Sequence, residues 1–240
     1  MTLSAGTTRA VLLPGTGSDD EFVRAVFLEP LRAVGIHLHT PAPRPGARLA
    51  EHYLDELTRH AGEGPILAGG LSFGAHLAAE WALANPDRCA GLLLALPAWH
   101  GAPDEAPAAL AAHASADAVA ALGVPAALRA ATEGIPDWLA AELRRSWPSY
   151  GAELATSLRV AARRAAPAAE ALETLAIPTG LGGFRDDPVH PIAMAESWAT
   201  RLPAATLRGT SIQAMATDRA ALGRATVLAW LSALGGKPTD

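Results

Sequence analysis

The segment PILAGGLSFGA, residues 65–75, joins a short apolar run to a glycine-rich turn. The run Pro65–Ala68 is almost continuously apolar, as expected for a strand that is buried on both faces of a sheet. A helical pattern follows over residues 73–85. Between the two lies Gly70-Leu71-Ser72-Phe73-Gly74, which has the spacing G-x-S-x-G. The segment therefore predicts a strand, a sharp turn that carries Ser72, and a helix.

The turn around Ser72 has the neighbours that a reactive serine needs. A strained turn brings backbone segments close together, so small residues are required beside it, and Gly70 and Gly74 meet that need. Such a turn lifts the Ser72 hydroxyl above the sheet and directs the N–H of Phe73 toward a developing oxyanion. The simpler alternative is a glycine-rich turn with a solvated serine, because a bare G-x-S-x-G occurs by chance in glycine-rich chains.

Outward from this turn, short apolar runs alternate with longer helical patterns, which predicts a doubly wound, mostly parallel α/β sheet of about six strands. The predicted strands are Ala10–Leu13, Ile36–Thr40, Pro65–Ala68, Ala90–Leu96, Ile177–Leu181 and Ala205–Arg208. Helices are predicted near residues 20–34, 47–60, 73–85, 190–201 and 217–234. Ser18, followed by Glu21, predicts a capping box at the start of the first helix.

Residues 98–175 interrupt this alternation. The stretch is rich in alanine, is broken by prolines and contains no plausible buried strand. It is interpreted as a helical lid or cap insertion, carried on a core formed by residues 1–97 and 176–240. A separate domain is the alternative, although the strand pattern resumes at Ile177 without a shift in character.

Composition excludes several classes of protein. Half of the 240 residues are apolar and 18% are charged, which argues against a disordered chain or a highly charged coiled coil. A net charge of −5 argues against a nucleic-acid partner, and the pairs Arg144-Arg145 and Arg163-Arg164 are interpreted as solvated helix faces. Cys89 is the only cysteine, so neither an intrachain disulfide nor a cysteine-based zinc site can form.

The remaining compositional signals concern location and cofactors. No apolar run reaches the roughly 18 residues needed to cross a bilayer, so no membrane partner is expected. The first fifteen residues lack the pattern of a cleaved secretion signal, and a cytoplasmic protein is the default expectation. Abundant Ala, Gly, Pro and Arg suggests a bacterial genome of high GC content. No feature demands a metal, nucleotide or flavin, so no cofactor is expected.

A second glycine-rich loop follows the first predicted strand. Gly15 and Gly17 allow the backbone around Thr16 to supply another N–H for an oxyanion. A phosphate-binding loop is the competing interpretation, but G-x-G-x-x-G would require glycine where Asp20 stands. The acidic residues beside it also put negative charge where a phosphate would lie.

Taken together, these motifs resemble the α/β-hydrolase superfamily, in a compact bacterial form that lacks the first two strands of the family. The resemblance covers about residues 9–100 and 176–234, with the insertion at the position of the lid. It implies that Ser72 is the nucleophile and that Phe73, with Thr16 and Gly17, forms the oxyanion hole. It also implies that Asp187, just before Pro188-Val189, is the catalytic acid; Asp186 stays open, as does a plain Asp-Pro turn.

The chain departs from this family at the general base. Such hydrolases carry a histidine after the final strand, but here the corresponding residues 208–214 contain Gln213, and no histidine follows His190. An amide cannot accept a proton near neutral pH, and an unactivated serine is a weak nucleophile. Loss of a triad member costs on the order of 10⁴ in rate. Another base must therefore serve, or hydrolysis is not the function.

Two of the eight histidines are candidates for that base. His100 lies at the carboxyl end of a central strand, where open α/β sheets bind ligands. His190 follows Asp187 by three residues, and a third possibility is that neither serves. The others are set aside: His37 and His39 on a half-polar edge strand, His52 and His60 on an exposed helix face, His76 as structural, and His113 on the insertion.

The leading functional hypothesis is an esterase- or thioesterase-like serine hydrolase acting on a small or medium apolar acyl substrate. Trp99, Trp138 and Trp147 are expected to line the substrate pocket, or merely to fasten the insertion to the sheet. The alternatives are a non-hydrolytic enzyme, such as a cyclase or lyase, and a non-catalytic binding protein on the same scaffold. The expected partner is a small molecule; substrate identity and oligomeric state are not predicted.

Overall fold

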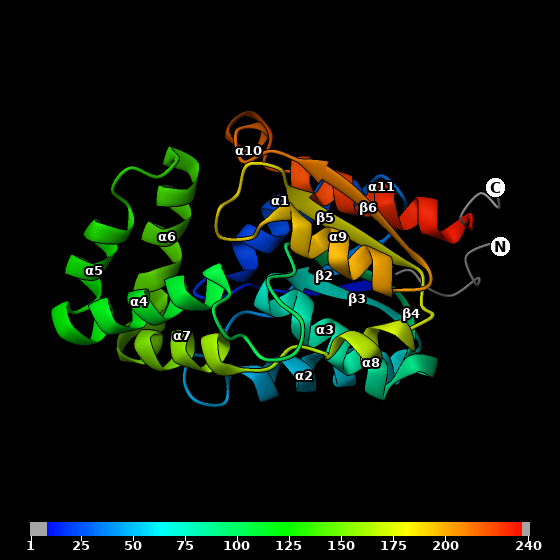
Figure 1. The fold of residues 1–240 in the computed structure, drawn as a ribbon, viewed down its shortest axis with the longest axis horizontal. Coiled ribbons are helices and arrows are strands. Elements are labelled where there is room, and N and C mark those ends of the chain that lie inside the picture. The colour runs from blue at the N-terminus through cyan, green and yellow to red at the C-terminus, as the bar shows by residue number, and fades with distance from the viewer. Residues whose placement is uncertain (1–8, 237–240) are drawn as a thin grey trace.

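A six-stranded sheet with the order β2-β1-β3-β4-β5-β6 organises the computed structural model, which describes residues 9–236 (Figure 1). Every neighbouring pair of strands is parallel. The strands are β1 (Arg9–Leu13), β2 (His37–His39), β3 (Ile66–Leu71), β4 (Cys89–Ala95), β5 (Thr179–Phe184) and β6 (Ala205–Thr210). The doubly wound parallel fold expected from the sequence is confirmed, and the carboxyl ends of all six strands share one edge.

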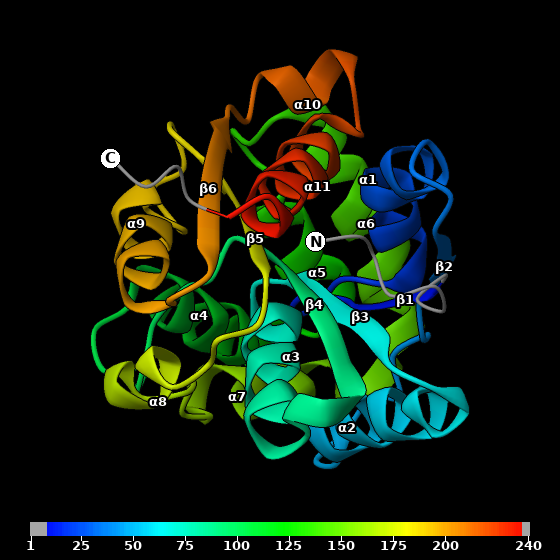
Figure 2. The ribbon, with the colours of Figure 1, turned by 90° about the vertical axis from the view of Figure 1, so that its right-hand side faces the viewer.

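Helices cover both faces of this sheet, as Figure 2 shows. One face packs against α1 (Asp20–Arg32) and α11 (Ala221–Leu234). The other packs against α2 (Leu49–His60), α3 (Phe73–Ala84) and α9 (Ile192–Arg201). Short helical turns are η1 (Ala61–Glu63), η2 (Pro86–Arg88), η3 (Gly151–Glu153) and α10 (Ala214–Thr217).

The central strands are buried on both faces because their apolar side chains alternate between two cores. In β4, Leu92 and Leu94 join the core under α2 and α3, whereas Leu93 joins the core under α1 and α11. This alternation explains why continuous apolar runs, rather than half-polar ones, mark the strands in the sequence.

Two details at helix starts differ from the sequence prediction. The cap of α1 is Asp19, not Ser18, because the Asp19 carboxylate accepts a hydrogen bond from the Phe22 N–H at 2.9 Å. The last helix begins at Ala221 rather than near residue 217, because α10 and the turn at Asp218 precede it.

Five helices lie between β4 and β5 and form the segment that interrupts the strand pattern. They are α4 (Pro107–Leu122), α5 (Val124–Ala131), α6 (Asp137–Tyr150), α7 (Leu154–Arg163) and α8 (Ala169–Glu173). Helices α4 to α7 stand beside the carboxyl edge of the sheet in Figure 1 and share an apolar cluster of their own, which includes Trp147, Tyr150 and Leu158.

Within residues 9–236, no helix combines the length and the apolar character that a membrane crossing requires. Residues 1–8, on which part of the expectation about a secretion signal rests, lie outside the described residues.

Candidate active site

Ser72 occupies a strained turn between β3 and α3. Its backbone has φ +50° and ψ −110°, in a region that L residues rarely adopt. The turn is held by the Ser72 N–H, which donates to the carbonyl oxygen of Ala95 at 2.8 Å. A side chain at Gly70 or Gly74 would overlap the carbonyl oxygen of Leu13. Both glycines are therefore required where β1 passes behind the turn, as the sequence pattern predicts.

His190 reaches Ser72 from the loop between β5 and α9. Its Nε2 lies 2.9 Å from Ser72 Oγ, and its Nδ1 lies 3.2 Å from Asp187 Oδ2. The side chains of His190 and Asp187 are only 17% and 9% exposed. The three side chains thus form a continuous chain of hydrogen bonds at the carboxyl edge of the sheet.

The loop that carries both Asp187 and His190 is folded by Asp187 itself. Asp187 Oδ1 accepts hydrogen bonds from the N–H groups of Val189 at 2.7 Å and His190 at 3.1 Å. This is an Asx turn, and it returns the histidine to the same carboxylate. Burial raises the pKa of Asp187, but hydrogen bonding and charge from His190 outweigh that effect and hold the pKa below its ordinary value.

The neighbouring acid, Asp186, has a different contact. Its Oδ1 accepts a hydrogen bond from the Ile212 N–H at 2.8 Å, which ties the loop after β5 to the loop after β6. Gln213, in the segment after β6 where the sequence comparison expects a histidine in α/β-hydrolases, is exposed. The structure therefore brings Asp187, and not Asp186, to the imidazole.

The other candidate base, His100, is partly buried at the end of the segment that follows β4. No hydrogen bond or ion pair joins it to Ser72, to Asp187 or to any other residue in the described part of the chain. His190 is thus the histidine that the fold places beside the serine.

His76 lies one turn into α3 and is fully enclosed. Its Nε2 accepts hydrogen bonds from the backbone N–H groups of Ala98 at 2.9 Å and Trp99 at 3.4 Å. Its ring stacks on Trp198. Burial, followed by the nearby charge of His190, lowers the pKa of His76 to about 3. The imidazole therefore stays neutral and holds the chain after β4, which supports its interpretation as a structural residue.

The loop after β1 runs directly beside the serine. A Cβ at Gly15 would lie 3.7 Å from Ser72 Cβ, and Gly17 has a positive φ of 65°. The N–H groups of Thr16, Gly17 and Phe73 donate no hydrogen bond to another described residue. The backbone of these two segments meets at Ser72, and the three N–H groups are unpaired among the described residues.

Helix α6 of the insertion holds this loop from the other side. The bonds are from Arg145 to both Asp19 carboxylate oxygens at 2.8 and 2.6 Å, from Ser146 Oγ to the Gly17 carbonyl at 2.8 Å, and from Tyr150 to the Ser18 carbonyl at 2.6 Å. The interpretation of Arg145 as part of a solvated face is wrong, because the Asp19 carboxylate pairs with it across the interface. Its pKa is raised chiefly by that hydrogen bonding.

The three tryptophans expected to line a pocket are all buried. Trp99 packs against His76 and donates from Nε1 to the Arg164 carbonyl at 3.3 Å. Trp138 stacks on Phe22, whereas Trp147 packs its Nε1 edge against Gly17. Trp99 and Trp138 thus fasten elements together, and Trp147 is the one that borders the loop beside Ser72.

No protein-family model and no curated protein sequence matches the chain. Solved structures do. The enol-lactonase from Burkholderia xenovorans LB400 superposes with a TM-score of 0.72 at 15% identity, over 95% of this chain and 92% of that one. MGS-M2, an alpha/beta hydrolase enzyme from a Medee basin deep-sea metagenome library, gives 0.69 at 16% identity, over 100% and 94%.

A thermophilic esterase from Thermogutta terrifontis has a TM-score of 0.64 at 21% identity, over 86% of this chain and 82% of its own. At these identities the likeness concerns the fold, and it extends over 86 to 100% of this chain.

Proposed function

Given that the chain has the α/β-hydrolase fold, we propose that it is a serine hydrolase of carboxylic ester or thioester bonds. The observation that carries the proposal is the contact of 2.9 Å between His190 Nε2 and Ser72 Oγ, with Asp187 on the opposite side of the ring. A nucleophile, a base within hydrogen-bond reach and a carboxylate that orients the base are the parts of a serine triad.

The reaction begins when His190 Nε2 accepts the proton of Ser72 as Oγ attacks the substrate carbonyl carbon. For this the imidazole must carry its proton on Nδ1, and the Asp187 carboxylate selects that tautomer by accepting the Nδ1–H. The resulting imidazolium then returns the proton to the leaving alcohol or thiol. Water, deprotonated by the same nitrogen, releases the acid from the acyl-enzyme.

The tetrahedral intermediates place negative charge on the former carbonyl oxygen. We assign the N–H groups of Phe73 and of Thr16 and Gly17 to that oxygen, since they border Ser72 and have no partner among the described residues. Removal of one such donor commonly costs about 10²- to 10³-fold in kcat.

An apolar acyl group is the substrate class that the surroundings favour. Leu96, Phe184 and Met215 come from the ends of β4 and β5 and from α10, and they belong to one apolar cluster together with Trp138. Such a wall accepts a small or medium apolar acyl chain. The Thermogutta protein is described as an esterase and the Burkholderia protein as an enol-lactonase, and both descriptions fit cleavage at an ester carbonyl.

The test is labelling with a fluorophosphonate probe, combined with hydrolysis of p-nitrophenyl esters of increasing chain length. We expect labelling that Ser72→Ala abolishes, and a loss of about 10³- to 10⁴-fold in kcat for His190→Gln. His100→Gln is the matched control and keeps labelling and kcat near those of the wild type.

A protein that is never labelled between about pH 6 and pH 9 contradicts the proposal. Turnover that survives Ser72→Ala would instead indicate a non-hydrolytic enzyme, and ligand binding without turnover a binding protein.

A further inference from the structure

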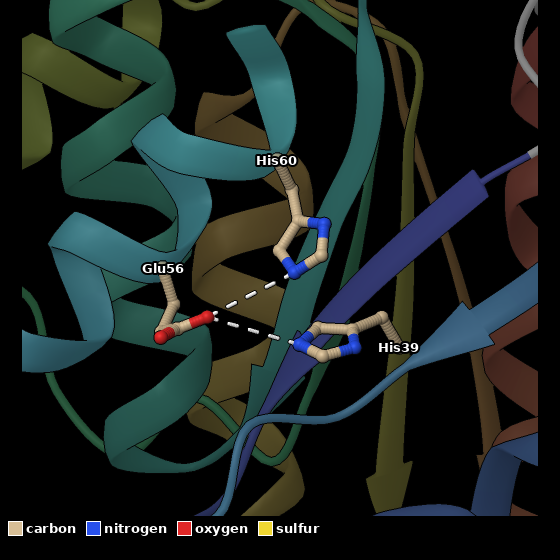
Figure 3. A group of neighbouring side chains, drawn as sticks. All are labelled: His39, Glu56 and His60. Atoms are coloured by element: carbon tan, nitrogen blue, oxygen red, sulfur yellow. Dashed lines mark ion pairs between the residues drawn. The ribbon is translucent and has the colours of Figure 1, made fainter. Parts of the chain in front are cut away.

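Three side chains with metal-binding atoms meet at the edge of the sheet, away from Ser72. His39 ends β2, and Glu56 and His60 lie one turn apart on α2. Glu56 Oε2 is 3.8 Å from His39 Nε2 and 3.8 Å from His60 Nε2, and all three side chains point toward one centre (Figure 3). Sequence patterning assigns His60 to an exposed helix face, but its side chain is only 13% exposed.

Both imidazoles direct the same ring atom into this centre. The Arg59 guanidinium lies 2.9 Å from His60 Nε2, and a guanidinium has donors only, so this nitrogen must be the acceptor with its lone pair facing inward. His39 Nε2 is buried and has no hydrogen-bond partner among the described residues.

A positive charge already occupies the edge of the centre. Arg59 contacts the Glu56 carboxylate as well as His60, while Arg44 lies 3.9 Å from the second Glu56 oxygen. The Arg59 side chain is 60% exposed, so it can turn into solvent without losing a packed environment. The three side chains therefore attract a positive charge. The Arg59 guanidinium, which supplies that charge here, is easily displaced.

We propose that His39, Glu56 and His60 bind a zinc ion in place of the Arg59 guanidinium. Two imidazole nitrogens and one carboxylate oxygen are a common zinc ligand set, with ligand bonds of about 2.0–2.1 Å and water at the fourth position. Tetrahedral geometry then separates the donor atoms by about 3.4 Å. The three donor atoms lie within 4.8 Å of one another, so small rotamer changes of these side chains bring them to the tetrahedral spacing. Imidazole ligands disfavour Mg²⁺ and Ca²⁺.

The ion joins the edge strand to the helix layer. Strand β2 has three residues, lies at the edge of the sheet and, among the described residues, pairs with β1 alone. Because β2 supplies one ligand and α2 supplies two, zinc stabilises this edge of the folded chain. The zinc proposal does not depend on the proposed hydrolase activity.

The experiment is calorimetric titration of the untagged full-length chain, freed of metal by a chelator, with ZnCl₂ and separately with MgCl₂. We expect one zinc ion per chain, no magnesium binding, and a rise of about 5 °C in the thermal midpoint at saturating zinc. His39→Gln and Glu56→Gln each remove one of the three ligands and weaken zinc binding at least tenfold. Loss of a residue that only supports a ligand already costs about 10- to 100-fold in metal affinity. Arg59→Ala strengthens it, because the competing guanidinium is gone.

His37→Gln is the matched control, since it removes an exposed histidine from the same short strand. It leaves the affinity unchanged. Circular dichroism verifies that each variant is folded, and Glu56→Gln provides a second ligand variant should His39→Gln fail to fold. Absence of saturable zinc binding overturns the proposal, as does an affinity that falls equally in His37→Gln and in the two ligand variants.

Discussion

Asp187 accepts hydrogen bonds from both the backbone N–H and the imidazole of His190, three residues farther along the same loop. The turn that folds this loop is therefore also the contact that orients the ring. In a chain without a histidine after β6, this local arrangement places a carboxylate and an imidazole together after one strand.

Asp187→Asn tests this arrangement. Asparagine keeps the oxygen that accepts the two backbone N–H bonds but removes the charge that fixes the imidazole tautomer. We expect kcat on a p-nitrophenyl ester to fall by about 10³- to 10⁴-fold, with the thermal midpoint nearly unchanged. The control is Asp186→Asn, which changes the adjacent acid and should keep most of the activity. Equal losses in both variants would contradict the assigned role of Asp187.

Ser146→Ala tests whether α6 positions the loop beside Ser72. The substitution leaves the Gly17 carbonyl without its 2.8 Å hydrogen bond, so we expect kcat to fall about tenfold, or about 1.4 kcal/mol, with a smaller change in KM. Ser149→Ala, on the same helix, removes only a bond to the helix's own Ser146 carbonyl. It should leave kcat within about twofold. A lowered stability with intact kcat would assign Ser146 a purely structural role.

His76 predicts a specific loss of stability in mild acid. Its pKa is lowered from 6.5 to about 3 in the folded chain, so between these values the unfolded chain binds a proton that the folded chain does not. Stability must therefore fall as the pH drops below 6.5, by about 2 kcal/mol at pH 5 from this residue alone.

The measurement is denaturant unfolding of the wild type and His76→Gln between pH 7 and about pH 5. Glutamine can still accept the Ala98 N–H but does not titrate, so the variant should show a shallower dependence on pH. His37→Gln should retain the wild-type slope. Parallel curves for the wild type and His76→Gln would show that another group causes the acid sensitivity.

Gly74→Ala tests the close approach behind the serine turn. The added methyl group would overlap the carbonyl oxygens of Leu13 and Pro14, which are backbone atoms and cannot rotate away. We expect destabilisation of about 3 kcal/mol or more in chemical unfolding, or failure to fold. At Gly62, where nothing lies within 4 Å of the added carbon, alanine should be tolerated. A stable and active Gly74→Ala variant would refute this steric account.

Much of the fold follows from local patterns. The continuous apolar runs and the G-x-S-x-G spacing predict β3, the turn and α3, because burial on both faces and the tight glycine contacts leave few other residue types possible there. The one wrong helix cap arose because Ser18 and Asp19 are both good caps, and only the observed backbone decides which side chain reaches the first free N–H.

The candidate site was predictable only in part. Ser72 and Asp187 follow from the motif and the strand order, whereas the choice between His100 and His190 depends on how one loop turns. The local signal was present, since an aspartate followed by proline favours an Asx turn that brings the third following residue back to the carboxylate.

The hydrogen bonds from α6 to the loop after β1 had no such local signal in the sequence. These hydrogen bonds join residues more than 120 positions apart, so no sequence window contains both partners. His39 is much nearer in sequence to Glu56 and His60, but it meets them only because β2 pairs with β1 and α2 packs behind it.

Because Asp187 and His190 share the loop after β5, the proposed mechanism uses no residue from the stretch that follows β6. In residues 211–217, the Ile212 N–H donates to Asp186, Met215 belongs to the apolar cluster that includes Phe184, and Ile212 packs against that cluster. Randomising the side chains of residues 211–217 in a directed-evolution library is therefore expected to change the preferred acyl chain length. Ser72, His190 and Asp187 lie outside the randomised segment and stay the same in every variant.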